Sequence, residues 1–153
     1  MREASHRAAR PARRGGLPNA CFVASTLDAL PPELNGIASL VAVHFPWGSL
    51  LRAALGEDQD GAAHLASLVA PGGTLRLLLS ASERDATRGA TELRPDEIAA
   101  RYLGLGLRPI TCRLATLADI AEAHSSWGRR LMTAGGGRCA WLLELRRVEP
   151  ALD

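Results

Sequence analysis

The strongest constraint on the fold is a repeated alternation of short apolar runs with amphipathic segments. Five runs are apolar and bounded by turn-forming residues, as buried strands are: residues 20–24 (ACFVA), 39–45 (SLVAVHF), 74–79 (TLRLLL), 108–114 and 139–145. Helical spacing marks four other segments: residues 49–55, 62–69, 94–103 and 117–131, the last allowing a break. Strands that alternate with helices predict an α/β sheet with helices on its faces.

Bulk properties predict one cytoplasmic domain. The 153 residues are 47% hydrophobic, enough for a single core, and the net charge of +2 is too small to indicate a nucleic-acid binder by itself. No apolar run reaches the roughly 18 residues that a membrane span needs. The arginine-rich N-terminus lacks the apolar stretch of a signal peptide.

The cysteines support neither a disulfide framework nor a zinc site. Cys21, Cys112 and Cys139 are odd in number and form no CxxC pair. Each is flanked by apolar residues, so we interpret all three as small core residues in a reducing compartment. We expect a monomer without a metal ion.

Residues 2–14 carry five arginines and favour a helix up to Pro11. They could form an RNA-binding tail, or the solvated second half of an amphipathic helix; we favour the helix because the run is short. Gly15 and Gly16 would end it.

Three ordered motifs resemble one enzyme family. The segment 44–56 (HFPWGSLLRAALG) resembles the aminoglycoside-resistance 16S ribosomal RNA (adenine-N1) methyltransferases, in which Phe-Pro-Trp-Gly-Ser follows the fourth strand. The segment 125–131 (SSWGRRL) resembles that family's tryptophan-bearing helix, and 25–38 (STLDALPPELNGIA) its acidic segment before Leu-Pro. The segment 68–79 (LVAPGGTLRLLL) resembles the turn and fifth strand of class I methyltransferases.

The resemblance implies S-adenosylmethionine (SAM)-dependent methylation of adenine N1 in the decoding site of small-subunit ribosomal RNA, which confers aminoglycoside resistance. Adenine N1 can attack the activated methyl group directly, so the enzyme must mainly supply positioning. By resemblance, Trp47 and Trp127 would stack on either side of the flipped adenine, since aromatic side chains hold an extruded base well. Both tryptophans could instead be core or surface anchors.

The resemblance also implies the cofactor and RNA contacts. Six residues would bind SAM: Thr26, Leu27, Asp28, Pro46, Ser49 and Ser125. Asp28 would accept protons from the adenine amino group, although the family carries Glu there; Ser49 could simply cap the following helix. Arg129, Arg130 and Arg138 would contact the RNA backbone, because guanidinium groups match phosphate oxygens.

The family's first two strands and glycine-rich cofactor loop have no counterpart before residue 20. The expected fold is therefore a partial class I (Rossmann-like) sheet with its first two strands missing: residues 1–19 are a residual helix and turn, and 20–153 hold strands three to seven. The remaining order is expected to be four, five, seven, six, with residues 39–45 as an exposed apolar edge that risks aggregation.

Three interpretations remain open. The chain is an RNA methyltransferase whose complete form is longer, a non-catalytic truncated remnant that keeps RNA affinity, or a small-molecule methyltransferase of the same fold. The tryptophan pair and the FPWG motif argue against the third.

Overall fold

The computed structural model describes residues 2–17, 19–80, 94–133 and 140–149. The chain divides into two compact units, residues 1–30 and 31–153. The single domain expected over the whole chain stays a prediction, and each unit is described by itself.

The first unit holds one short α-helix and two 3-10 turns: α1 (Arg2–Ala8), η1 (Ala12–Arg14) and η2 (Leu27–Ala29). The helix ends before Pro11, and Gly15, with φ of 76°, closes η1. The predicted strand at residues 20–24 is wrong: these residues are irregular and exposed. A strand exists only by pairing its backbone with another, and apolar composition cannot supply that partner. Cys21 is exposed, so its expected core position is also wrong.

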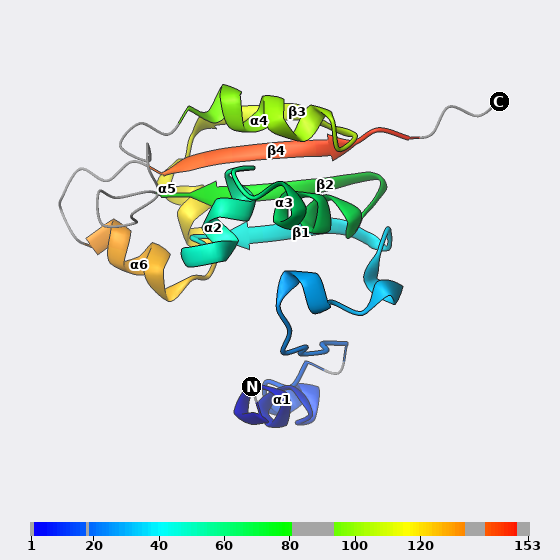
Figure 1. Cartoon of the computed structure of the whole chain (residues 1–153). Helices are drawn as coiled ribbons and strands as arrows, with labels where there is room; N and C mark the ends of the chain where they lie inside the picture. The colour runs from blue at the N-terminus through cyan, green and yellow to red at the C-terminus, as the bar shows by residue number, and fades with distance from the viewer. Residues whose placement is uncertain (1, 18, 81–93, 134–139, 150–153) are drawn as a thin grey trace. The chain divides into compact units, whose positions relative to one another are not determined.

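The second unit is built on a four-stranded sheet (Figure 1). Its strands are β1 (Ala38–His44), β2 (Val69–Leu79), β3 (Leu107–Leu114) and β4 (Trp141–Arg147), in the order β1-β2-β4-β3. β1 and β2 are parallel, whereas β4 is antiparallel to both β2 and β3. This is the order expected for the family's fourth, fifth, seventh and sixth strands.

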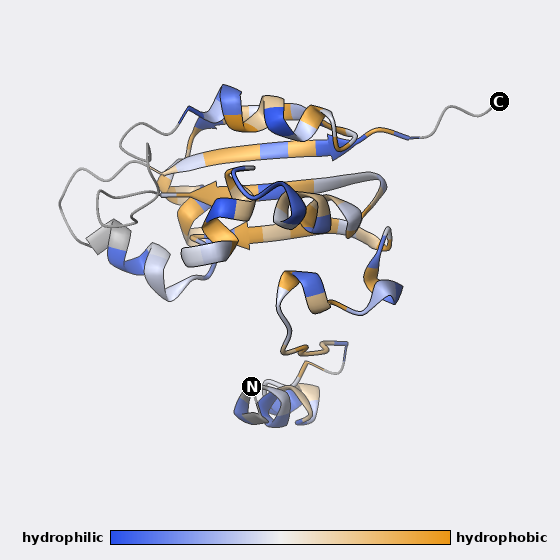
Figure 2. Ribbon diagram, viewed as in Figure 1, coloured by the Kyte–Doolittle hydropathy of each residue, from blue (hydrophilic) through white to orange (hydrophobic). Residues whose placement is uncertain are grey.

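One face of the sheet carries the main core under α2 (Gly48–Ala54), α3 (Gln59–Ser67) and α4 (Pro95–Leu103) (Figure 1). Alternate residues of the central strands point to this face, and five of their side chains are fully buried: Leu75, Leu77 and Leu79 of β2, with Leu143 and Leu145 of β4. The hydropathy colouring shows the apolar residues concentrated in these strands (Figure 2). Tyr102 of α4 is also buried, and its hydroxyl donates to the Ala53 carbonyl at the end of α2 (2.8 Å).

The helix predicted at residues 62–69 is displaced. Asp58 accepts a hydrogen bond from the Gly61 N–H (3.1 Å) and so starts α3 earlier, while Val69 already belongs to β2. The Pro71-Gly72-Gly73 turn lies inside β2, where the pairing with β1 jumps from Ala38↔Val69 to Leu40↔Thr74. Gly72 has φ of 71°, which a glycine adopts easily.

The opposite face is covered at one end by α5 (Leu117–Glu122) and α6 (Ser126–Thr133), so helices lie on both faces as predicted. The predicted break in residues 117–131 is confirmed at His124, where φ is 47°. η3 (Pro32–Leu34) precedes β1.

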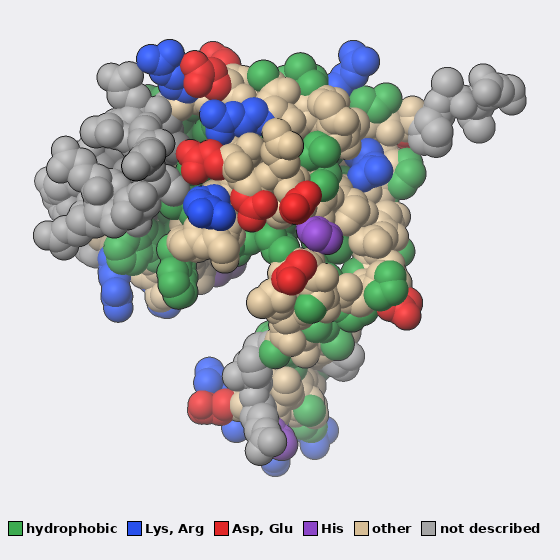
Figure 3. All heavy atoms as spheres, in the orientation of Figure 1, with side chains coloured by type: hydrophobic (Ala, Val, Ile, Leu, Met, Phe, Trp, Pro, Cys, Tyr) green, Lys and Arg blue, Asp and Glu red, His purple; other side chains and the backbone are tan. Residues whose placement is uncertain are grey.

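The prediction that residues 39–45 form an exposed apolar edge of the sheet is also confirmed. Within the described residues β1 pairs with β2 alone, and Leu40 of β1 is 50% exposed. On the face of the molecule shown in Figure 3, acidic and basic side chains are interspersed, which fits the small net charge of +2.

Candidate functional site

The loop after β1 is held in an uncommon backbone conformation. Phe45 has φ of 49° and Gly48 has φ of 60°, so two left-handed positions flank Pro46 and Trp47. A left-handed residue other than glycine costs about 1–2 kcal/mol and persists only where its surroundings fix it. The Phe45 N–H donates to the Leu78 carbonyl (2.8 Å), and its ring is buried. The loop therefore presents Trp47, 82% exposed, directly before α2.

A second sharp turn presents the other predicted tryptophan. After His124, the Ser125 hydroxyl accepts hydrogen bonds from the N–H groups of Trp127 (3.2 Å) and Gly128 (3.4 Å). Ser125 thus caps α6, satisfying N–H groups that lack a partner inside the helix. Trp127 lies in the first turn of α6 and is 42% exposed.

One small apolar cluster anchors both tryptophan segments. Its buried members come from four different parts of the second unit: Phe45, Leu78, Ile120, Ala140 and Leu142. Gly128 of α6 packs directly on this cluster. Because Phe45 precedes Trp47 by two residues and Gly128 follows Trp127, both tryptophans belong to the end of the sheet where β1 finishes.

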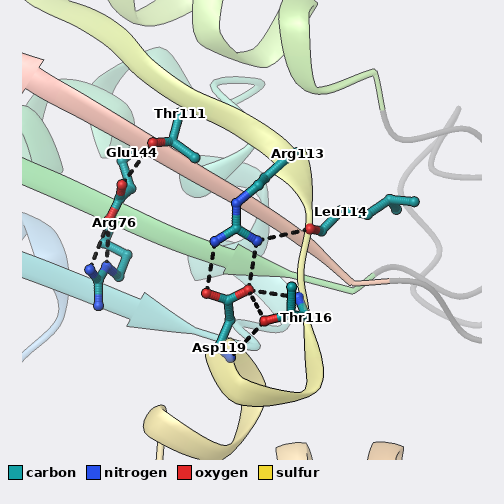
Figure 4. Close-up of polar contacts among 7 residues, drawn as sticks. All are labelled: Arg76, Thr111, Arg113, Leu114, Thr116, Asp119 and Glu144. Carbon is teal, nitrogen blue, oxygen red and sulfur yellow. Dashed lines mark hydrogen bonds and ion pairs between the residues drawn. The ribbon is translucent and has the colours of Figure 1, made fainter.

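A polar network fixes α5 beside this cluster (Figure 4). The guanidinium of Arg113 in β3 donates to both carboxylate oxygens of Asp119 (2.7 and 2.9 Å). Asp119 and Thr116 also form a reciprocal capping box at the start of α5. The Arg113 hydrogen bonds, and then those from Thr116, hold the pKa of Asp119 well below its usual range.

A second polar chain crosses the same face of the sheet (Figure 4). Arg76 of β2 forms an ion pair with Glu144 of β4 (2.8 Å), and Glu144 accepts a hydrogen bond from Thr111 of β3 (2.8 Å). Arg76 also lies 3.6 Å from Glu122 of α5. The three strands and α5 are thereby joined through charged groups.

A cavity of about 180 Å³ lies between α5 and this face. Leu40, Ala42 and His44 of β1 line it beside Arg76 of the neighbouring strand β2, and Glu122 of α5 lines it as well. Burial, and then the charge of Arg76, lowers the pKa of His44, against the effect of its hydrogen bond to the Ala123 backbone. His44 is therefore held toward its neutral form.

The predicted cofactor residues fall in both units. Thr26, Leu27 and Asp28 lie at the start of η2 in the first unit, and Asp28 is exposed. Pro46, buried, and Ser49, exposed, follow β1 in the second unit. The capping role considered for Ser49 is wrong, because α2 begins at Gly48 and Trp47 occupies its N-cap position.

The predicted RNA-binding residues lie on or beyond α6. Arg129 and Arg130 are exposed on that helix, immediately after the Trp127–Gly128 pair. Arg138, like Cys139, lies outside the described residues. In the parts of the chain that the structure describes, no three His, Cys, Asp or Glu side chains gather as a metal site, and no helix is long and apolar enough to cross a membrane.

Sequence reasoning missed the residues that hold the site. The Thr116-x-x-Asp119 spacing is a readable capping-box signal and could have indicated the start of α5. The Arg113 partner of Asp119 and the left-handed Phe45 depend on the folded chain and leave no such local signal.

Comparison with known proteins identifies the family. The family model NpmA, described as 16S rRNA (adenine(1408)-N(1))-methyltransferase, matches residues 1–145. The chain belongs to the NpmA family. Its relatives include the 16S rRNA (adenine(1408)-N(1))-methyltransferase of Streptoalloteichus tenebrarius, 34% identical over 139 residues, with 86% of this chain and 64% of the relative covered.

Two further relatives extend the comparison. An rRNA methyltransferase of Saccharopolyspora hirsuta is 29% identical over 86% of this chain and 88% of its own length. The crystal structure of a 16S rRNA (adenine(1408)-N(1))-methyltransferase variant with cosubstrate SAM, from Catenulisporales acidiphilia, matches at a TM-score of 0.82 and 30% identity. The match covers 100% of this chain and 72% of that structure. The resemblance and the α/β fold are thus confirmed, and the chain spans 64% of the length of the Streptoalloteichus relative.

Proposed function

We propose that this member of the NpmA family takes part in SAM-dependent methylation of adenine N1 in the decoding site of 16S rRNA; its relatives are named as methyltransferases of adenine N1 in 16S rRNA. The observation that carries the proposal is the pair of exposed tryptophans, Trp47 and Trp127, whose segments are anchored on one apolar cluster. Two large aromatic side chains left in solvent at the end of a sheet suit a flat, extruded base.

The proposed chemistry asks little of the protein beyond positioning. SAM supplies an electrophilic methyl group on a sulfonium centre. Adenine N1 brings its own lone pair, so no side chain has to act as a nucleophile. Trp47 and Trp127 would hold the base flat and keep N1 in line with the methyl carbon, and such orientation contributes much of an enzyme's rate gain.

We propose that the six residues implied by the family resemblance contact the adenosine part of SAM. Asp28 offers an exposed carboxylate that can accept from the exocyclic amino group, and the backbone of Thr26 and Leu27 adjoins it. Ser49 would offer an exposed hydroxyl where β1 ends, and the buried Pro46 would help to shape the loop beside it. Ser125 already caps α6, so its proposed contribution is to place that helix beside the cofactor.

The proposed RNA partner is the small ribosomal subunit. Arg129 and Arg130 extend from the same helix as Trp127, where they can contact phosphates that flank the extruded base; Arg138 stays a prediction of the same kind. We propose further that the protein acts as a cytoplasmic monomer without a metal ion, and that the modification confers aminoglycoside resistance.

A second candidate is a non-catalytic form that keeps RNA affinity. It is favoured by the open edge of β1, where Leu40 is exposed. Such a form would bind RNA through Trp47, Trp127 and the arginines without binding SAM.

Two measurements test the proposal. Calorimetric titration of SAM into the folded, monodisperse chain asks whether it completes a cofactor site. Radiolabelled SAM with purified small ribosomal subunits, followed by primer extension, then asks which nucleotide is methylated. The proposal expects binding and a single stop at a decoding-site adenine. Methylation elsewhere in the RNA would contradict it, and RNA binding without SAM binding would favour the non-catalytic form.

A further inference from the structure

Gly128 allows α6 to lie unusually close to its neighbours. A Cβ atom at this position would lie 3.1 Å from Cε2 of Phe45 and 3.1 Å from Cγ2 of Ile120, tighter than an ordinary carbon contact. It would also lie 3.2 Å from the Ile120 carbonyl oxygen. Glycine weakens a helix, so its place in the first turn of α6 serves this close approach.

Phe45 forms the other side of the contact, and its own backbone is constrained. Its φ of 49° is held by the hydrogen bond to the Leu78 carbonyl and by burial of the ring in the cluster. A return to extended backbone would withdraw the ring from Gly128 and redirect Pro46 and Trp47. A strained residue that the fold fixes so firmly points to a role at the site.

We propose that Phe45 and Gly128 are positioning residues that set the separation of the Trp47 and Trp127 side chains, and so define a slot for one adenine base. The inference rests on the proposed function and deepens it. Neither residue touches the base. Phe45 acts through the two-residue link to Trp47, and Gly128 through the adjacent Trp127.

The contact between Gly128 and its neighbours Phe45 and Ile120 tolerates little added volume, because the backbone is fixed on both sides of it. An added methyl at Gly128 has to move α6 away from the Phe45 ring and from the α5 backbone, since the Ile120 carbonyl cannot rotate aside. A shift of a fraction of an ångström at α6 widens the slot, and a misplacement of about 1 Å can reduce a rate about a hundredfold.

The test is the affinity of the 153-residue chain for adenosine 5′-monophosphate, followed by quenching of tryptophan fluorescence. The variants are Gly128→Ala and, as a second route to the same contact, Phe45→Leu. The matched control is Gly104→Ala, because Gly104 ends α4 with φ of −64° and a Cβ there meets nothing within 4 Å. Circular dichroism at the same temperature confirms that each variant is folded.

The expected result is a dissociation constant raised about tenfold in both variants, the scale of one lost base stack, and unchanged in the control. The double variant should recover part of the affinity lost in Gly128→Ala, because Phe45→Leu relieves one of the close contacts while those with Ile120 remain. Because the readout is the nucleotide affinity of folded variants, this partial rescue would connect the Phe45–Gly128 contact with the base slot.

Three results would overturn the inference: no quenching with the parent chain, parental affinity in a folded Gly128→Ala variant, or parental affinity in a folded Phe45→Leu variant. Methylation of 16S rRNA is measured separately. If the adenosine 5′-monophosphate affinities are as expected but no RNA is methylated, the proposed function is wrong while the inference of a base slot is still supported.

Discussion

At the scale of single residues, the tryptophans give the most direct test of the base-stacking site. Trp47→Ala and Trp127→Ala should each lower methylation turnover about 10- to 100-fold, because one base stack contributes about 1–3 kcal/mol. The dissociation constant of SAM should stay unchanged. The measurement is steady-state methylation of small ribosomal subunits.

The tryptophan variants also remove exposed apolar surface, so they need a control that does only this. The matched control is Leu117→Ala, since Leu117 is 69% exposed on α5. It should keep parental turnover. Unchanged turnover in both tryptophan variants would remove Trp47 and Trp127 from the site.

The two described cysteines should differ in reactivity. Burial, and then the hydrogen bond from its thiol to Asp96, raises the pKa of Cys112 to about 11, whereas Cys21 is exposed. The thiolate is the reactive form, so at pH 8 iodoacetamide should alkylate Cys21 well before Cys112. Peptide mass spectrometry of a Cys139→Ser variant measures both rates, with the unfolded chain as the control. Equal rates in the folded chain would contradict this environment for Cys112.

At the scale of elements, the capping box and ion pair of α5 should make the fold sensitive to acid. The pKa of Asp119 is lowered in the folded chain by Arg113 and Thr116, so its carboxylate stabilises the fold fully above its unfolded pKa of about 3.9. That stabilisation is lost as the pH falls below this value toward the folded pKa. Thermal unfolding midpoints from pH 5 to pH 3 should fall more steeply in the parent than in Asp119→Asn.

Thr116, the uncharged residue of the same capping box, provides the control for this prediction. Thr116→Ala should lower the free energy of unfolding by about 0.5–2 kcal/mol at pH 7, the usual effect of a lost cap, and keep much of the acid dependence. Parallel pH curves for the parent and Asp119→Asn would show that Asp119 is not the responsible group.

The elements also show what the sequence could and could not reveal. Apolar runs bounded by turn residues located β1, β2, β3 and β4, and helical spacing located α4, because these patterns are local to each segment. It failed at residues 20–24, where apolar composition resembles a strand but no partner backbone is paired with it. The FPWG and SSWG motifs identified Trp47 and Trp127, yet not the left-handed Phe45 or the Phe45–Gly128 contact, because both arise from packing between segments distant in the chain.

At the scale of the whole molecule, we expect the open edge of β1 to promote aggregation of the protein at high concentration. Among the described residues β1 pairs with β2 alone, so its outer backbone groups and the exposed Leu40 form a template on which another strand can pair. Leu40→Lys should reduce self-association, because each added copy would bring a like charge to the same edge. The control is Leu103→Lys: Leu103 is similarly exposed, at 53%, but lies on α4. The apparent molecular mass from light scattering, measured against protein concentration, should be lowered in Leu40→Lys and unchanged in Leu103→Lys. An equal decrease in both variants would mean that association depends on general surface hydrophobicity and not on the β1 edge.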